Sequence, residues 1–394
     1  MGPFALTETI HTLTSYPQHS NNDVHLKGNS MTFISKSASR RHAPSYIALA
    51  TGLALALSAC GGTTNSSTSG GGAAATSSAT ADPNAPLKEG LKVAFLPKQL
   101  NNSYFTVTDR GGKNAVAEFK GSFSEVGPSE ASASSQVSYI NTLTQQGTDI
   151  IATSANDPKA ICSALDEARS AGATVITFDS DTDPSCRDLY INQATAEGIA
   201  STQVKLISEA IGADGGDIAV LSATANATNQ NAWIELMKKE LQKPEYSKLK
   251  LVATVYGDDN AQKSQQEVQA LLQQYPTLKG IISPTTVGVA AAAQYLAGSE
   301  YKGRVQLTGL GFPSQLKEFL KNGTMKSFAL WDVEKLGYLA AYAGAALASG
   351  QITGAEGQTF KAGTLGEFKV GANSTVLLGD PTVFTPENVD QYNF

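Results

Sequence analysis

Residues 149–184 read DIIATSANDPKAICSALDEARSAGATVITFDSDTDP, and this stretch holds two short apolar runs with a helical pattern between them. The runs DIIATS and TVITF are continuous rather than alternating, which is typical of strands buried on both faces of a sheet. A strand, a helix and a strand in this order indicate a parallel pair covered by the connecting helix. The stretch therefore predicts an α/β fold built on parallel sheets.

The same alternation continues toward both ends of the chain. Short apolar runs predict strands at 92–96, 123–126, 149–154, 174–178, 217–222, 249–256, 280–283, 304–310 and 327–331. Segments with helical spacing fill nearly every gap between these runs. Two parallel sheets of about four to six strands each fit this length.

Composition limits the class of protein. The chain has 394 residues, of which 41% are hydrophobic and 16% are charged, so it has enough apolar residues for a folded core. Its length predicts two to three domains. The net charge is −6 and the isoelectric point is near 5.4. Because no basic stripe is present, nucleic acid is not expected as a partner.

Histidine usage excludes several chemistries. All four histidines lie in the first 42 residues, at positions 11, 19, 25 and 42. If this segment is removed in the mature protein, no imidazole remains downstream. Histidine-based nucleophilic catalysis and histidine-ligated metal sites are then excluded.

The first 86 residues carry targeting signals rather than a folded domain. Residues 1–30 are interpreted as a non-native extension before a start at Met31, and residues 31–59 as a signal peptide with a charged start and a short apolar run. The LSAC motif that ends at Cys60 and is followed by glycine resembles the bacterial lipoprotein signal, which implies lipid on Cys60. An ordinary secretory signal with an incidental cysteine is the alternative. Residues 60–86 are rich in Gly, Ser, Thr and Ala, which predicts a flexible tether.

Ligands of open α/β sheets bind beyond the carboxyl ends of the strands. The segments that follow the predicted strands are LPKQLNNSYF, TSANDP, FDSDTDP, LSATANATNQ, SPTT, TGLGFP and LWD. They are rich in Asn, Asp, Thr and aromatic residues and poor in basic ones. This set, without a nucleophile–base pair, favours a neutral polyol site over an active site. Asx-turns and helix caps are the alternative for any single residue.

Two motifs that could bind a metal or a cofactor fail on inspection. FDSDTDP places aspartates at alternate positions, but Pro184 and Tyr190 stand where an EF-hand needs Gly and Glu. TGLGFP lacks the third glycine and the downstream acid of a dinucleotide fingerprint. We therefore expect neither a metal nor a cofactor.

The two tryptophans are interpreted differently. Trp233 lies on a helical pattern with Met237, and core packing and ligand contact both remain open for it. Trp331 ends a predicted strand and precedes Asp332, so it is predicted to contact a ligand.

From about Leu87 to its end, the chain resembles the type I periplasmic sugar-binding proteins, the ribose-binding-like subunits of ABC importers. The segments LPKQLNNSYF, GPSEASASSQVSYINTL, FDSDT, LSATANATNQNAW, SPTTVGVAAA and ALWDVEKLGYLA are most similar to rhamnose-binding proteins and the related autoinducer-2-binding proteins. The resemblance implies that residues 87–394 form two Rossmann-like lobes joined by three crossing strands. Lobe 1 would span about 91–192 with part of 332–394, and lobe 2 about 193–330 with part of the C-terminal segment.

The resemblance also implies a set of ligand contacts. They are Lys98, Asn102, Tyr104, Phe105, Ser154 (or Asn156), Asp179, Asp181, Asn229, Gln230, Pro284, Thr285, Thr286, Trp331 and Asp332. Two arginines of the ribose-type pattern are missing, because Ser180 follows Asp179 and Asn229 stands at the other position. Ribose itself is therefore not expected, and Lys98 is the remaining cationic donor.

The function expected from this resemblance is that of a monomeric, extracytoplasmic binding lipoprotein, not an enzyme. It would capture a sugar, most plausibly L-rhamnose, between closing lobes and deliver it to an ABC permease in the bacterial cytoplasmic membrane. Binding of autoinducer-2 or another pentose or hexose, for uptake or signalling, is the alternative. A transcription regulator of this fold is disfavoured by the signal peptide and the acidic charge. A glycoside hydrolase using Asp179 and Asp181 is disfavoured because the two lie on one loop.

Two cysteines remain after Cys60, and an oxidising compartment favours their pairing. A disulfide between Cys162 and Cys186 is therefore predicted. Two buried free thiols are the alternative, because pairing needs Cα atoms within about 7 Å.

Overall fold

The structure is a computed structural model, and it describes residues 81–392 and 394. The predicted extension, the signal peptide, Cys60 and most of the predicted tether lie outside the described residues. The described end of that tether contacts the fold. The Asp82 amide donates to the Gly350 carbonyl at 3.0 Å, and Gln351 Nε2 donates to the Ala85 carbonyl at 2.7 Å. Residues before 87 therefore already pack against the domain, earlier than the predicted boundary.

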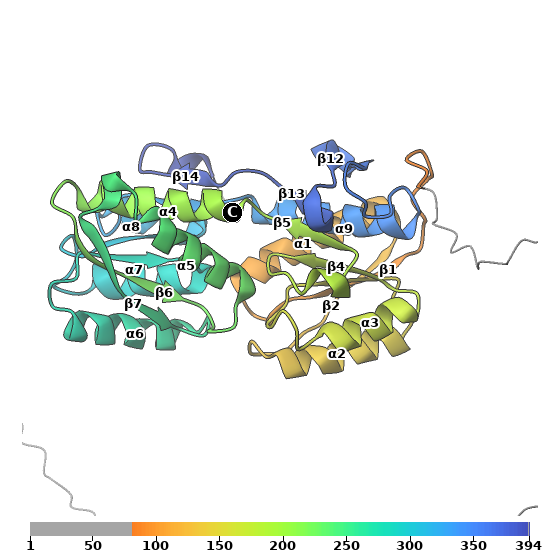
Figure 1. Ribbon diagram of the computed structural model, residues 1–394, viewed down its shortest axis with the longest axis horizontal. Coiled ribbons are helices and arrows are strands. Elements are labelled where there is room, and N and C mark those ends of the chain that lie inside the picture. The colour runs from red at the N-terminus through yellow and green to blue at the C-terminus, as the bar shows by residue number, and fades with distance from the viewer. Residues whose placement is uncertain (1–80, 393) are drawn as a thin grey trace, which may run out of the picture. The chain divides into compact units, whose positions relative to one another are not determined.

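Lobe 1 contains a six-stranded sheet in the order β13-β5-β4-β3-β1-β2, with every neighbouring pair parallel (Figure 1). Its strands are β1 (Lys92–Leu96), β2 (Ser122–Glu125), β3 (Ile150–Thr153), β4 (Thr174–Phe178), β5 (Leu189–Asn192) and β13 (Thr375–Leu377). Its helices pack in two pairs: α1 (Ser103–Glu118) with α9 (Val333–Ala348), and α2 (Ala133–Gln145) with α3 (Cys162–Ser170).

Lobe 2 contains a four-stranded parallel sheet in the order β7-β6-β8-β9. Its strands are β6 (Gly216–Ser222), β7 (Leu249–Tyr256), β8 (Gly280–Ser283) and β9 (Gln306–Gly309). Its helices are α4 (Ala196–Ile211), α5 (Thr228–Glu240), α6 (Ala261–Gln274), α7 (Thr286–Ala297) and α8 (Pro313–Lys321). The antiparallel pair β10 (Phe328–Leu330) and β14 (Thr382–Phe384) continues the sheet through a bridge between Leu310 and Ala329.

The chain crosses between the lobes three times. It leaves lobe 1 after β5, returns between β10 and α9, and leaves again between β13 and β14 (Figure 1). Two parallel-sheet lobes with a three-segment hinge confirm the predicted fold class. The middle crossing holds residues 331–332, directly between a strand of lobe 2 and a helix of lobe 1.

Each of the nine predicted strands has a counterpart in the structure. The runs at 92–96, 174–178, 249–256 and 280–283 match the observed strands at both ends, and the other five predictions differ by one or two residues at an end. Strands β5, β11 (Thr359–Lys361), β12 (Glu367–Lys369), β13 and β14 were not predicted. They have three or four residues each, so they carry no apolar run that stands out from their surroundings.

Helices α1 and α9 pack closely because glycines line their contact. A Cβ on Gly111 would lie 1.9 Å from the Glu334 carbonyl oxygen, and one on Gly337 would lie 1.8 Å from the Thr108 carbonyl oxygen. Any larger residue at either position would push the helices apart. This packing fixes the start of α1 relative to the crossing that precedes α9, and both places carry side chains of the site.

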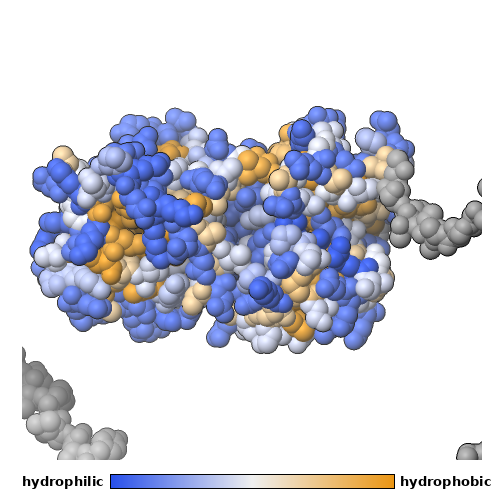
Figure 2. All heavy atoms as spheres, viewed as in Figure 1, coloured by the Kyte–Doolittle hydropathy of each residue, from blue (hydrophilic) through white to orange (hydrophobic). Residues whose placement is uncertain are grey.

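The visible surface is mostly hydrophilic, with scattered apolar residues (Figure 2). Leu377 is the only large hydrophobic residue of the described chain that is exposed. Among the described residues, no helix combines the length and the apolar character that a membrane crossing requires.

Candidate functional site

A cavity lies between the lobes. Its lining residues come from the carboxyl ends of strands in both sheets, from the starts of helices and from the hinge: Lys98, Asn102, Tyr104, Phe105, Asp179, Asn229, Gln230, Trp233, Asp259, Pro284, Thr285, Thr286, Leu310, Leu330 and Trp331.

A buried polar network joins the lobes in this cavity. Lys98, after β1, has its Nζ 3.4 Å from Asp179 Oδ2 and 3.3 Å from Asn229 Oδ1. Asn229, at the start of α5 in lobe 2, donates from Nδ2 to Asp179 Oδ1 at 3.2 Å. All three residues are less than 9% exposed. A charge pair this far from water is stabilised only if its remaining groups find hydrogen-bond partners, and Asn229 supplies them across the cleft.

Asp179 is held in place from lobe 1. It follows β4 with a φ of 58°, a left-handed conformation that is uncommon outside glycine and is often found at functional positions. Ser154 Oγ donates to its Oδ2 at 2.8 Å, and the Tyr190 hydroxyl donates to its carbonyl at 2.9 Å. The carboxylate is therefore oriented toward the cavity by its own lobe.

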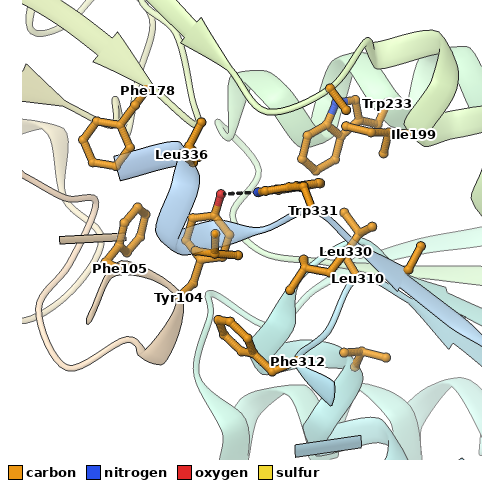
Figure 3. Packing of buried hydrophobic residues seen from close by; sticks show 14 of the residues in the cluster. Tyr104, Phe105, Phe178, Ile199, Trp233, Leu310, Phe312, Leu330, Trp331 and Leu336 are labelled. Carbon is orange, nitrogen blue, oxygen red and sulfur yellow. Dashed lines mark hydrogen bonds between the residues drawn. The ribbon is translucent and has the colours of Figure 1, made fainter. Parts of the chain in front are cut away.

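Aromatic side chains form the wall near the hinge (Figure 3). Asn102 caps α1 by accepting the Tyr104 amide at 3.0 Å, which places Tyr104 and Phe105 in the first turn. Trp331 Nε1 donates to the Tyr104 hydroxyl at 3.0 Å, and its ring packs edge-on against Tyr104 and Trp233. Burial, with a smaller contribution from the Asp179 carboxylate, raises the pKa of Tyr104 well above its usual value. The phenol stays protonated and has its own hydrogen to donate.

Polar groups of lobe 2 face this wall. Gln230 Oε1 accepts from Ser222 Oγ at 2.7 Å and from the Ala223 amide at 2.8 Å, so its amide orientation is fixed. The hydroxyl of Thr285, beside the start of α7, donates to Asp259 Oδ1. Burial raises the pKa of Asp259.

The structure brings most of the predicted site residues together. The predicted residues that line the cavity are Lys98, Asn102, Tyr104, Phe105, Asp179, Asn229, Gln230, Pro284, Thr285, Thr286 and Trp331. Trp331 is also only 3% exposed and packs on other rings, so it belongs to the core as well as to the cavity wall.

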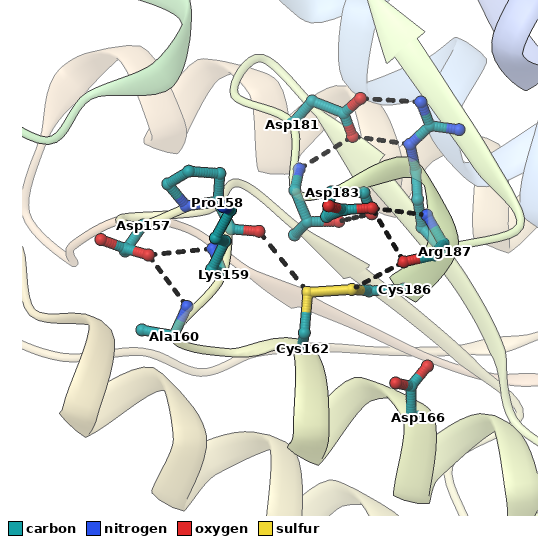
Figure 4. The surroundings of a disulfide bond; sticks show 12 residues. Asp157, Pro158, Lys159, Ala160, Cys162, Asp166, Asp181, Asp183, Cys186 and Arg187 are labelled. Atoms are coloured by element: carbon teal, nitrogen blue, oxygen red, sulfur yellow. Dashed lines mark hydrogen bonds and ion pairs between the residues drawn. A yellow bond between two sulfur atoms is a disulfide. The ribbon is translucent and has the colours of Figure 1, made fainter.

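Three predicted residues do not line the cavity, and the structure corrects their placement. Asp181 makes a two-point ion pair with Arg187, Nε to Oδ1 at 2.6 Å and Nη2 to Oδ2 at 2.7 Å, away from the cavity (Figure 4). Asp332 caps α9 by accepting the Lys335 amide at 3.1 Å. Ser154 lies behind Asp179 and orients it. Asn156, its alternative, donates to the Lys98 carbonyl at 2.8 Å and supports the loop after β1.

Sequence reasoning missed Asp259, Leu310 and Leu330, and it left Trp233 undecided. Asp259 lies in the segment GDDN, directly after the strand predicted at 249–256. The rule that ligands bind at the carboxyl ends of strands applies to this segment too, so the signal was present. Leu310 and Leu330 are single apolar residues at strand ends, which no pattern distinguishes from core residues.

A disulfide braces the loop that presents Asp179. Cys162, the first residue of α3, is bonded to Cys186, with Cα atoms 5.2 Å apart (Figure 4). Cys186 ends a 3-10 turn formed by Pro184–Cys186, next to Arg187. The covalent bond and the Arg187–Asp181 pair together hold the loop after β4.

The site offers hydrogen-bond donors, acceptors and aromatic faces. Lys98 and the Tyr104 hydroxyl can donate, the carboxylates of Asp179 and Asp259 can accept, and Asn229 can do both. Within the described residues, no group of three or more His, Cys, Asp or Glu side chains is arranged to hold a metal ion. Such a site can bind and orient a small polar molecule with an apolar face.

Comparisons with known proteins agree with this geometry. Residues 93–352 match the family model described as a periplasmic binding protein domain. A solved structure of a sugar ABC transporter protein from Actinomyces odontolyticus is 53% identical, covers 77% of this chain and 98% of its own, and has a TM-score of 0.63.

Two solved structures with bound ligands are also similar. A solute-binding protein from Clostridium phytofermentas with bound L-rhamnose is 37% identical over 77% of this chain and 98% of its own, with a TM-score of 0.75. LsrB from Clostridium saccharobutylicum, in complex with AI-2, is 28% identical over 77% of this chain and 100% of its own, with a TM-score of 0.73.

Proposed function

This chain belongs to the family of periplasmic binding protein domains, and from that premise we propose that it is the sugar-binding subunit of an ABC importer. The observation that carries the proposal is the cavity between the lobes, where aromatic rings face a network of amides, hydroxyls and carboxylates. The 53% identity to a sugar ABC transporter protein supports the transport role. The chain would deliver its sugar to permease subunits in the membrane and act as a monomer.

Lobe closure is the mechanism of capture. Hydrogen bonds join the lobes in this structure, among them Lys98 with Asn229, Asn229 with Asp179, and Gln315 Nε2 with Ser103 Oγ at 3.2 Å. Such contacts exist only when the lobes are closed. A sugar adds bonds to both lobes at once, so it shifts the population toward the closed form by its extra contacts there.

We propose L-rhamnose as the ligand. The cavity holds one ammonium group, on Lys98, and two carboxyl groups, on Asp179 and Asp259, which disfavours an anionic sugar. Leu310 and Leu330 beside Trp331 offer an apolar wall for the methyl group of a 6-deoxyhexose. The 37% identity to a protein with bound L-rhamnose supports this choice.

Autoinducer-2 is the second candidate, because a 28% identical protein binds AI-2. Its recognition residues in the resemblance, Lys98, Gln230, Pro284 and Thr286, also line the cavity here.

A thermal shift panel tests the function directly. L-rhamnose, D-ribose, D-glucose and autoinducer-2 are added to the purified protein at about 100 times the expected Kd. A ligand that binds only the folded state then adds about 2.7 kcal/mol, which raises Tm by about 5 °C or more. We expect this rise with L-rhamnose. No rise with any of these compounds contradicts the proposed function.

The N-terminal segment would anchor the protein. The LSAC motif before Gly61 supports lipid attachment at Cys60, which would hold the domain at the outer face of the cytoplasmic membrane. Mass spectrometry of the mature N-terminus tests this: a diacylglyceryl-modified Cys60 is expected, and an unmodified or differently cleaved N-terminus contradicts it.

A further inference from the structure

Asp259 stands out because its backbone is held in an unfavourable conformation. It follows β7, and both Asp258 and Asp259 have left-handed φ values, 52° and 49°. Asn260 then caps α6 by accepting the Lys263 amide at 2.9 Å. Two successive left-handed aspartates are costly, and such strain persists where the surroundings require it.

Contacts fix only part of the Asp259 side chain. Oδ1 accepts a hydrogen bond from the Thr285 hydroxyl, and the backbone carbonyl accepts one from Gln99 Nε2 of lobe 1 at 3.5 Å. Among the described residues, none donates a hydrogen bond or forms an ion pair to Oδ2. Because the residue lines the cavity between the lobes, this oxygen is available to a ligand.

Asp259 occupies the boundary of the cavity. It also lines an adjoining outer cleft, together with Gln99, Glu130, Asp258 and Lys263, so it separates the cavity from the outside. Asp179, the other carboxylate of the cavity, comes from lobe 1, whereas Asp259 comes from lobe 2. A ligand held by both would be bound from the two lobes at once.

We propose that Asp259 is a ligand-binding, specificity-determining residue, whose Oδ2 accepts a ring hydroxyl of the sugar when the lobes close. The inference rests on the proposed function and deepens it. Asp179 accepts a hydroxyl from the side of lobe 1 and Asp259 accepts another from the side of lobe 2. The ligand class is therefore a neutral sugar with free hydroxyls at two separate ring positions, and a sugar that lacks the second hydroxyl loses its contact with lobe 2.

Asp259→Asn is the test variant and Asp258→Asn is its matched control. Asparagine tolerates the left-handed region, so neither change adds backbone strain. Asp258 is exposed and pairs with Lys263 outside the cavity, with Nζ and Oδ2 2.5 Å apart. Calorimetry compares the wild type and both variants with L-rhamnose and with its 2-deoxy, 3-deoxy and 4-deoxy analogues. Thermal unfolding without sugar checks that each variant is folded.

We expect Asp259→Asn to weaken L-rhamnose binding by about tenfold, the usual size of a hydrogen bond to a charged acceptor. Asp258→Asn should stay within about twofold of the wild type. For one deoxy analogue, the wild type and Asp259→Asn should bind equally, because the hydroxyl that Asp259 accepts is already missing.

Two results would overturn the inference while the proposed function stands: unchanged L-rhamnose affinity in Asp259→Asn, or the same loss of affinity for every analogue. The second result means that the residue acts on the shape of the cavity and not on one hydroxyl. If the wild type binds no sugar at all, the proposed function fails first and this inference fails with it.

Discussion

Asp179 receives hydrogen bonds from both lobes, so a single side chain links the ligand cavity to lobe closure. Asp179→Ala removes the acceptor and leaves Lys98 and Asn229 with unsatisfied buried groups. We expect binding of L-rhamnose to weaken by about 2 kcal/mol or more, roughly 30-fold, when measured by calorimetry. An affinity equal to that of the wild type would contradict the role given to Asp179.

Asp181→Asn is the matched control, because Asp181 lies on the same loop but pairs with Arg187 instead of facing the cavity. Loss of the Asp181–Arg187 ion pair in this variant should lower the free energy of unfolding and leave the affinity for sugar nearly unchanged. A large loss of affinity in Asp181→Asn would restore the direct contact that was predicted from the sequence.

Asp109 links stability to pH. Both of its carboxyl oxygens are buried without a hydrogen-bond partner among the described residues. Burial, with a smaller contribution from Glu125, raises the pKa of Asp109 well above its usual value. A carboxyl whose folded pKa exceeds its unfolded pKa stabilises the fold below the unfolded pKa, and this stability is lost as pH rises through the folded pKa.

Asp109→Asn should therefore be more stable than the wild type at about pH 8, and the gain should disappear below about pH 3, where the folded and the unfolded states both bind the proton. Urea unfolding at the two pH values measures the difference. If the free energy of unfolding of Asp109→Asn rises equally at both pH values, or falls at high pH, burial of the charged carboxyl does not explain the difference in stability.

Sequence reasoning found nine of the fourteen strands in the described residues and missed five, each of three or four residues. Strands such as β3 and β4 bury continuous runs, whereas β13 has three residues and pairs with β5 from a distant part of the chain. The candidate site shows the same limit. Both Asp179 and Asp181 were predicted from the sequence to contact the ligand, but Asp179 lines the cavity whereas Asp181 is paired with Arg187.

The disulfide joins helix α3 to the loop after strand β4 and stabilises both. Its closed loop of 24 residues contributes about 3 kcal/mol in the chain-entropy model. We expect Cys162→Ala with Cys186→Ala to lower the free energy of unfolding by about this amount, measured with urea. Two thiols that titrate in the denatured, unreduced wild type would contradict the bond.

At the scale of the whole molecule, three crossing segments allow the lobes to move while the cavity residues stay fixed within each lobe. Lobe 1 presents Lys98, Tyr104 and Asp179, and lobe 2 presents Asn229 and Thr285. Neither set alone surrounds a ligand. In the proposed mechanism, binding and closure are therefore coupled, and affinity would depend on contacts that only the closed form makes.

Calorimetric titration of the purified protein with L-rhamnose tests the central claim most directly. The account predicts one site per chain with a Kd of about 1 μM, close to 8 kcal/mol of binding free energy. D-ribose should bind more weakly, because the two arginines of the ribose-type pattern are absent. A folded protein that gives no binding heat with L-rhamnose but binds autoinducer-2 would contradict the ligand, and one that binds neither would contradict the account itself.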